Sequence, residues 1–242
     1  MDYGIQLYSV RDMASVDYER ALREVAALGY EFVEPAGFFG HSAQQVKAWL
    51  DRYGLYVSGT HSSFADLEND FEGTVQYHKT IGNTRYIVPA VSLNTKEELD
   101  AAVEKFNRFG PMLADHGIEL GYHNHAREFW KNADGIVPEE YFRELTNVKF
   151  QMDTYWVFAA KKDPVEVLDE YRDRLIGCIH LKDGFKYPEV KGCALGEGSA
   201  PVRDIIAKAK DMGLKMVVES EGLDPTGIEE VARCARFLKA EG

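Results

Sequence analysis

The sequence is poor in cysteine. Its 242 residues include only three, Cys178, Cys193 and Cys234, and no two of them form a C-x-x-C pair. This usage excludes a disulfide-stapled secreted scaffold and favours a reducing compartment. The first residues are polar and do not resemble a signal peptide, so we expect a cytoplasmic protein.

Positive charge is also scarce. Lys and Arg number 28 against 40 Asp and Glu, which gives a formal net charge of −12 at pH 7. Nucleic-acid backbones are bound by clustered Lys and Arg, so this balance argues against a nucleic-acid groove. No apolar run approaches the roughly 20 residues that a membrane-spanning helix needs. We therefore expect neither a nucleic-acid nor a membrane partner.

Several catalytic motifs are missing. The sequence has no G-x-G-x-x-G, no G-x-x-x-x-G-K-[ST] and no G-x-S-x-G, so it gives no support for a dinucleotide site, a P-loop or a hydrolase elbow. Residues 196–199 (Gly-Glu-Gly-Ser) are typical of a loop that precedes a helix. The amides of that loop are expected either to bind an anion or to belong to an ordinary helix cap.

What the sequence does contain is a regular alternation of short β-rich runs with longer segments of helical periodicity. Eight runs occur, at residues 4–8, 32–34, 56–60, 86–91, 118–122, 148–152, 176–181 and 215–219. Capping boxes between them begin at Ser42, Thr95 and Thr226. Glycines near the ends of the helical segments stop the helices shortly before the next run.

Eight strands alternating with helices, at about 30 residues per unit, favour a parallel sheet closed into a (β/α)8 TIM barrel. An open, doubly wound sheet is the alternative. The length suits one barrel, because barrels of this type run to about 250 residues. No linker rich in Pro, Gly or Ser interrupts the chain, so we predict one α/β domain over residues 1–242.

Polar residues collect at the ends of the last four runs, where TIM barrels carry their chemistry. These ends supply His123, Asp153, His180 and Glu219. Mixed imidazole and carboxylate ligands suit Mn²⁺, Zn²⁺, Co²⁺ or Fe²⁺, whereas carboxylates alone would favour Mg²⁺ or Ca²⁺. A single His or Asp at the end of a strand is commonly a helix cap or a hydrogen-bonded loop residue. Several unpaired imidazoles and carboxylates, however, are costly to bury together. The set predicts a divalent-metal site or a hydrogen-bonded network.

Six short motifs follow one another along the chain: GIQLYSVR (4–11), GYHNH (121–125), QMDTYW (151–156), CIHLKD (178–183), LGEG (195–198) and VVESE (217–221). In this order and spacing they resemble the xylose isomerase-like TIM-barrel superfamily, and the resemblance covers nearly the whole chain. That superfamily includes sugar isomerases and epimerases, inosose dehydratases and the endonuclease IV type of nuclease.

The resemblance implies one divalent metal held by Glu, Asp, His and Glu from the fifth to eighth strands. Asp153, His180 and Glu219 match the last three of these ligands. At the first position the chain has His123, which would replace the glutamate, and Glu128 is the other candidate. The metal is expected to be Mn, Zn, Co or Mg.

Two departures from the family pattern bear on the reaction. Trp156 stands where the isomerases and nucleases tend to have the His of Asp-x-x-His, and His123 breaks the glutamate pair that epimerases place on opposite faces of the substrate. Both bring the chain closer to the branch that resembles inosose dehydratases and keto-sugar lyases. An elimination needs only one base, one acid and the metal.

The resulting hypothesis is an isomerase or lyase that acts on a sugar, keto-sugar or cyclitol. Proton abstraction α to a carbonyl would give an enediolate stabilised by the metal. The candidate bases are Glu219, Glu221 and His125. The candidates for holding the oxyanion or protonating the leaving group are Lys182 and His61. The candidate substrate contacts are Arg11, Glu34 and Trp156.

Other functions fit the same fold. Sugar epimerisation is one alternative, and a non-catalytic sugar-binding barrel is another. An abasic-site endonuclease is opposed by the negative charge and by the missing Asp-x-x-His motif, because its trinuclear site could hardly be assembled. A homodimer is compatible with the aromatic residues Tyr141 and Phe142, although burial of one side against the barrel explains them equally.

Overall fold

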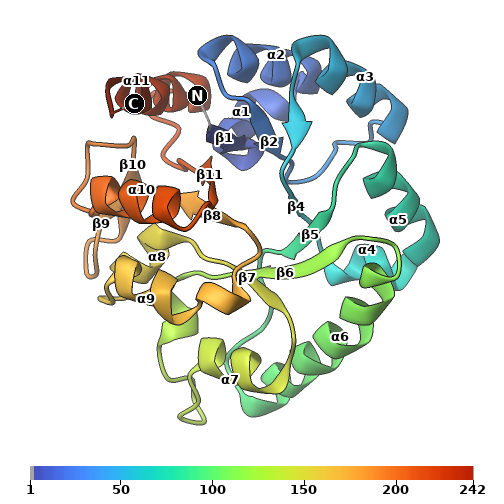
Figure 1. The fold of residues 1–242 in the computed structure, drawn as a ribbon, viewed down its shortest axis with the longest axis vertical. Coiled ribbons are helices and arrows are strands. Elements are labelled where there is room, and N and C mark those ends of the chain that lie inside the picture. The colour runs from blue at the N-terminus through green and yellow to red at the C-terminus, as the bar shows by residue number, and fades with distance from the viewer. Residues whose placement is uncertain (1–2, 242) are drawn as a thin grey trace.

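The computed structural model describes residues 3–241. Parallel strands form the centre of the molecule (Figure 1). Each strand is short, and each apolar run predicted from the sequence overlaps one of them or, in one case, two. The parallel strands are β1 (Tyr3–Gln6), β2 (Phe32–Glu34), β3 (Tyr56–Val57), β4 (Thr60–His61), β5 (Arg85–Val88), β6 (Glu119–His123), β7 (Lys149–Gln151), β8 (Cys178–Leu181) and β11 (Lys215–Val218).

The strands close into a barrel. One sheet has the order β3-β2-β1-β11-β8 and the other the order β4-β5-β6-β7. Isolated parallel bridges join Ala36 to His61 and Asp153 to His180, so the end of β2 lies beside β4 and the end of β7 beside β8. Because β3 and β4 are one strand interrupted at Ser58, the barrel has the eight strands of a TIM barrel. The predicted fold is confirmed.

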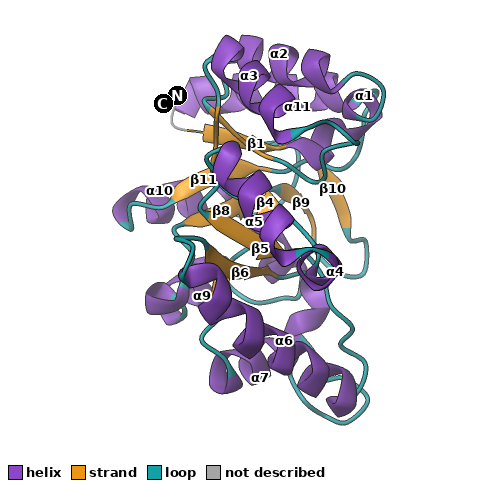
Figure 2. Ribbon diagram, turned by 90° about the vertical axis from the view of Figure 1, so that its right-hand side faces the viewer, coloured by secondary structure: helices purple, strands orange, loops and turns teal. Residues whose placement is uncertain are grey.

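Helices surround the strands on the outside, as Figure 2 shows from the side. They follow the strands in alternation, with some connections carrying two helices. The helices are α1 (Arg11–Ala14), α2 (Tyr18–Leu28), α3 (Ala43–Tyr53), α4 (Phe64–Asn69), α5 (Phe71–Thr80), α6 (Lys96–Ala114), α7 (Pro138–Leu145), α8 (Thr154–Ala159), α9 (Pro164–Glu170), α10 (Val202–Asp211) and α11 (Gly227–Glu241). Short 3-10 turns are η1 (Leu7–Val10), η2 (Ala126–Phe129) and η3 (Arg172–Arg174).

Local capping chemistry sets where the helices begin. The reciprocal capping box of Ser42 and Gln45 starts α3 as the sequence predicts. At α6 only half of the expected box forms. Thr95 caps the helix, but the Glu98 carboxylate accepts from the amide of Asn94 at 2.6 Å instead of from Thr95.

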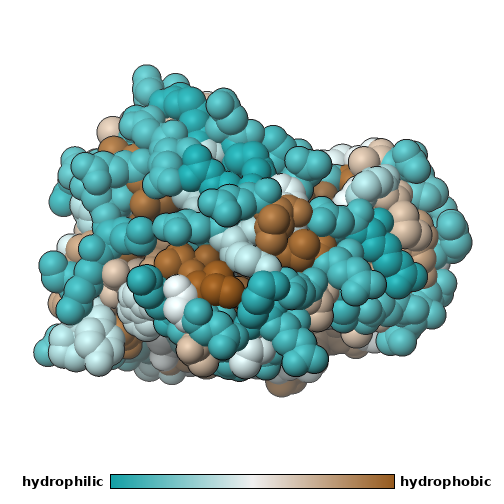
Figure 3. Space-filling view, turned by 90° about the horizontal axis from the view of Figure 1, so that it is seen from below, coloured by the Kyte–Doolittle hydropathy of each residue, from teal (hydrophilic) through white to brown (hydrophobic). Residues whose placement is uncertain are grey.

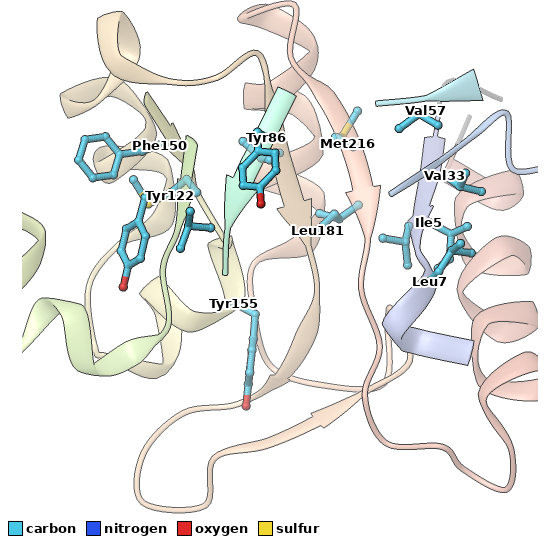
Figure 4. Close-up of a cluster of buried hydrophobic side chains, with 14 of the residues drawn as sticks. Ile5, Leu7, Val33, Val57, Tyr86, Tyr122, Phe150, Tyr155, Leu181 and Met216 are labelled. Atoms are coloured by element: carbon cyan, nitrogen blue, oxygen red, sulfur yellow. The ribbon is translucent and has the colours of Figure 1, made fainter. Parts of the chain in front are cut away.

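Alternation along the strands creates two apolar layers. Side chains that point outward pack against the helices, and Figure 4 shows Ile5, Val33 and Leu181 among them. Side chains that point inward form a smaller cluster that includes Phe32, Cys178 and Val217. Because successive side chains on one face are two residues apart, the next inward positions belong to the polar residues of the barrel mouth.

A second β element was not predicted. An antiparallel hairpin of β9 (Asp183–Phe185) and β10 (Lys191–Cys193) follows β8 on the carboxyl side of the barrel. The first run also ends earlier than expected, because the chain turns into η1 after Gln6. Phe142 is fully buried, which removes it from any dimer face. None of the described helices is both long enough and apolar enough to cross a bilayer.

Candidate active site

Four buried side chains converge at the carboxyl end of the barrel. His123 ends β6, Asp153 follows β7, His180 lies in β8 and Glu219 follows β11. Each offers a ligand atom, and these atoms all lie within 4.8 Å of one another. The predicted convergence of these four residues is therefore observed. His61 adds a third imidazole, since it groups in the same way with His123 and His180.

This donor set fits a divalent cation. Two of its buried atoms, Nδ1 of His123 and Oδ2 of Asp153, have no hydrogen-bond partner among residues 3–241. Burial, reinforced by the neighbouring His180 and His61, holds the pKa of His123 well below its usual range. The imidazole of His123 is therefore neutral, as a metal ligand must be.

The carboxylates of the donor set differ in their surroundings. Burial raises the pKa of Asp153 to about 7 against the opposing charge of Lys182. Burial also favours a neutral Glu219, but the charges of Lys182 and His180 outweigh it and hold the pKa of Glu219 well below its usual range. A cation bound here would favour the ionised form of both carboxylates.

Glu34 orients His180 from beneath the donor set. His180 Nε2 donates to Glu34 Oε1 at 2.6 Å, which leaves Nδ1 facing Glu219 at 3.4 Å and Asp153 at 3.9 Å. Gln6 and Gln151 also donate to the Glu34 carboxylate, at 2.8 Å and 2.6 Å. Burial opposes the charged form of His180, but Glu34 and Glu219 outweigh it and raise its pKa to about 10, so Nδ1 also carries a proton. A cation bound here would displace that proton, and because Glu34 holds the other hydrogen on Nε2, Nδ1 would be the ligand atom.

The structure thus places Glu34, a predicted substrate contact, inside the barrel with no exposed surface. Burial by itself raises the pKa of this carboxyl, but the charge of His180 and the hydrogen bonds from His180 and Gln151 reverse the effect and lower it. His61 Nε2 lies 3.1 Å from Glu34 and shares a 2.8 Å hydrogen bond with Gln151. Burial lowers the pKa of His61, which favours a neutral imidazole.

Lys182 is a buried cation that forms ion pairs with two glutamates. It forms a close ion pair with Glu221, and its Nζ lies 3.6 Å from Glu219 and 4.6 Å from the centre of the Trp156 ring. Burial opposes the charge of Lys182, but Glu219, Asp153 and Glu221 together raise its pKa above the usual value. Lys182 is therefore a fixed ammonium group.

A cavity of about 480 Å³ lies above these residues and is called the mouth cavity below. Four of the five predicted catalytic residues line it, and Lys182 does not. Those four are His61, His125, Glu219 and Glu221. Sequence reasoning assigned no role to Ser62, Ser63 and Asp66, which also line it. The Ser63–Asp66 capping box at the start of α4 is the sequence signal for their position.

The remaining predicted substrate contacts do not line the mouth cavity. Arg11 donates to the carbonyl oxygens of Tyr8 at 2.9 Å and Glu221 at 3.0 Å, so it supports the rim. The ring of Trp156 lies 5.4 Å from that of His125, and its Nε1 has no hydrogen-bond partner within the described chain. Tyr8 is 44% exposed and lines the cavity instead.

Glu128 lies beside His125, outside the donor set. Its Oε1 accepts from Tyr122 at 2.8 Å and lies 3.9 Å from His125 Nδ1. Burial lowers the pKa of His125, but Glu128 outweighs that effect and the pKa is raised. Of the two candidates for the first ligand, the structure brings His123 rather than Glu128 to the other donors.

Two buried carboxylates stabilise loops at the carboxyl end of the barrel by accepting hydrogen bonds from loop amides. Asp183 accepts from the amides of Gly196 at 2.9 Å and of Gly198 and Ala200 at 3.1 Å. The amides expected to bind an anion or to cap a helix are thus occupied by a carboxylate of the chain itself. In the same way Glu230 accepts from the hydroxyl of Ser220 and from two amides of the loop after β11.

Comparison with known proteins gives a consistent family. A family model described as xylose isomerase-like TIM barrel matches residues 22–240. An inosose dehydratase of Geobacillus kaustophilus (strain HTA426) is 26% identical over 193 residues, which cover 68% of this chain and 61% of that protein. The chain therefore spans about three fifths of the length of such curated relatives.

Solved structures share the whole barrel. A sugar phosphate isomerase/epimerase from Parabacteroides distasonis ATCC 8503 superposes with a TM-score of 0.83 at 25% identity, covering 98% of this chain and 93% of that one. The probable 3-DHS dehydratase AsbF from Bacillus anthracis has a TM-score of 0.77 at 14% identity and covers 99% of both chains. The second similarity is one of fold alone.

Proposed function

The chain belongs to the xylose isomerase-like TIM-barrel family, and we propose that it is a divalent-metal-dependent lyase or isomerase of a sugar, keto-sugar or cyclitol. The observation that carries this proposal is the buried set of His123, Asp153, His180 and Glu219 beneath an open cavity. Burying Oδ2 of Asp153 and Nδ1 of His123 without hydrogen-bond partners is costly unless a cation binds there.

These four residues would hold the metal. Their nitrogen and oxygen donors suit Mn²⁺, Zn²⁺ or Co²⁺ better than Mg²⁺. When bound, such a cation supplies Lewis acidity to a substrate carbonyl and stabilises negative charge that develops on its oxygen. Glu34 contributes by keeping Nδ1 of His180 directed at the other donors.

Two residues of the mouth cavity are free to transfer protons. The carboxylate of Glu221 lines the cavity and is paired with Lys182, so it is our candidate for the base that removes the α-proton. His125, whose pKa is raised beside Glu128, is our candidate for the acid that protonates a leaving oxygen. A base and an acid of different kinds suit elimination better than epimerisation. The inosose dehydratase name of the curated relatives supports the same choice.

Metal analysis tests the proposal. Elemental analysis of untagged protein should give about one divalent ion per chain. The ion should be lost in His180→Ala, which removes a donor, and bound more weakly in Asp153→Asn, which removes the charge of a donor. His116→Ala, at the end of α6 away from the mouth, is the control and should keep its ion. Keto-sugars and inososes should then be consumed only by metal-loaded wild type and control. A wild type that stays empty after incubation with Mn²⁺, Zn²⁺, Co²⁺ and Mg²⁺ contradicts the proposal.

A further inference from the structure

A second cavity adjoins the mouth cavity. Its volume is about 450 Å³, close to that of the mouth cavity itself. The two cavities share His61, Ser62 and Asp66 as lining residues, so they lie on either side of the same short segment. A molecule held over the donor set therefore has a second compartment within reach.

The lining of the second cavity suits a ring with hydroxyl groups. Phe38 and Tyr77 pack with ring centroids 4.4 Å apart, and neither is fully buried. Aromatic faces of this kind pack against the apolar face of a sugar or aryl ring. Asp66 and Asp70 also line the cavity, and carboxylates accept hydrogen bonds from hydroxyl groups. Gly37 leaves room, because a Cβ there would meet no heavy atom within 4 Å.

The charge of both cavities disfavours a phosphate. Neither has a lysine or arginine among its described lining residues, whereas Asp66, Asp70 and Glu221 contribute carboxylates. The loop amides of residues 196–200, the other anion site that the sequence offered, already donate to Asp183. A phosphate group in the second cavity would therefore meet the carboxylates of Asp66 and Asp70 with no lysine or arginine in the lining to offset them.

We propose that the second cavity is a subsite for a second ring, so that the substrate is an uncharged two-ring compound, a disaccharide or an aryl glycoside, rather than a sugar phosphate. This inference rests on the proposed function only for the placement of the first ring over His123, Asp153, His180 and Glu219. It assigns a ligand class to Phe38, Asp70 and Tyr77, which the chemistry at the metal donors does not use.

Calorimetric titration of metal-loaded protein with three probes tests the subsite. D-glucose offers one ring, 4-nitrophenyl β-D-glucopyranoside offers two, and D-glucose 6-phosphate adds a charge. The glycoside should bind about tenfold more tightly than glucose, as expected for one stacked ring. The phosphate should bind more weakly than glucose. Equal affinities for glucose and the glycoside, no binding of the glycoside, or tighter binding of the phosphate overturns the proposal.

Variants separate the subsite from the reaction. Phe38→Ala should abolish the preference for the glycoside and leave the affinity for glucose unchanged. If Phe38→Ala proves unstable, Asp70→Asn replaces it, because it keeps a capping side chain at the start of α5. Asp70→Asn should weaken the binding of the glycoside but not the binding of glucose. Tyr187→Ala, an exposed aromatic outside both cavities, is the matched control and should behave as wild type. A Phe38→Ala protein that is folded and keeps the preference contradicts the proposal.

Failure of the proposed function would give a different result. If the chain does not use a metal, metal loading and keto-sugar consumption fail, whereas the preference of the apoprotein for two rings over one remains measurable. If only the subsite is wrong, metal loading and turnover persist while the preference for the second ring is missing.

Discussion

Single buried carboxylates in this protein differ in function because their surroundings differ. Glu34 is ionised and receives hydrogen bonds from His180, Gln6 and Gln151. Glu139 is equally buried, but neither of its oxygens has a hydrogen-bond partner in residues 3–241. Burial, reinforced by the charge of Glu128, raises the pKa of Glu139 well above its usual value. Glu34 is thus an acceptor in a polar network, and Glu139 is a neutral acid.

This contrast gives a prediction for metal binding. Glu34→Gln keeps the shape of the side chain but removes the charge that orients His180. We expect the affinity for a divalent cation to fall about 10–100-fold, the usual effect of losing such a partner. Competition with a chelator measures it. Glu139→Gln is the matched control and should bind metal like wild type. Wild-type affinity in Glu34→Gln would show that His180 is oriented without this carboxylate.

At the scale of elements, the inside of the barrel depends on where glycine is used. Gly4 in β1 faces Phe32 of β2, and a Cβ at position 4 would overlap the Phe32 ring and lie 2.8 Å from its carbonyl oxygen. Gly121 in β6 faces Ile176 in the same way, with a Cβ only 2.5 Å from Cδ1. Small residues on these strands leave the space that larger inward side chains fill.

Two alanine substitutions test this packing. Gly4→Ala should destabilise the fold by about 1–3 kcal/mol or more, because backbone and ring must both move. Gly110→Ala, near the end of α6 and directly before Pro111, should change the stability by no more than about 1 kcal/mol, because the gain in helix propensity is offset by the restriction that proline places on the residue before it. There the nearest neighbour of a new Cβ is Leu120 Cδ2 at 3.9 Å. Urea denaturation of both variants decides the matter. Equal stability of Gly4→Ala and wild type would mean that the strands can separate at little cost.

At the scale of the whole molecule, the closed barrel is an acidic protein. The chain carries a formal net charge of −12, and hydrophilic side chains dominate the face in Figure 3, with apolar ones in small patches. Two buried histidines of this acidic molecule, His78 and His123, are kept neutral by desolvation. His78 is 3% exposed and accepts from Asn83 at 2.9 Å, and burial lowers its pKa to about 4.

The neutral His78 makes global stability depend on pH. Between its folded pKa of about 4 and its ordinary value of 6.5, the unfolded chain binds more protons than the folded one. The stabilisation is therefore complete above pH 6.5 and is lost as the pH falls towards 4. From pH 7 to pH 4.5 wild type should lose about 2 kcal/mol more than His78→Gln. Urea denaturation at the two pH values measures the difference, with His116→Gln as control. An equal loss in His78→Gln and wild type contradicts the assignment.

The sequence by itself determined the barrel and the convergence of its main polar residues. Strand alternation and helix caps such as Ser42 depend on neighbours a few positions away, so the sequence contains them directly. The eight runs and their order then bring His123, Asp153, His180 and Glu219 to one end, because parallel strands end at the same edge. The hairpin after β8 was not predicted because its strands, Asp-Gly-Phe and Lys-Gly-Cys, form neither an apolar run nor an alternating pattern.

Only the tertiary structure decided which partner each of these side chains has. Glu34 accepts from Gln151 and His180, which are 117 and 146 positions away, and Lys182 pairs with Glu221 39 positions on. Asp183 fills the loop that the sequence left open to an external anion. Such contacts depend on how far each strand is staggered and how the barrel closes, and no local periodicity encodes either. Pairing, burial and pKa values therefore follow from closure of the barrel.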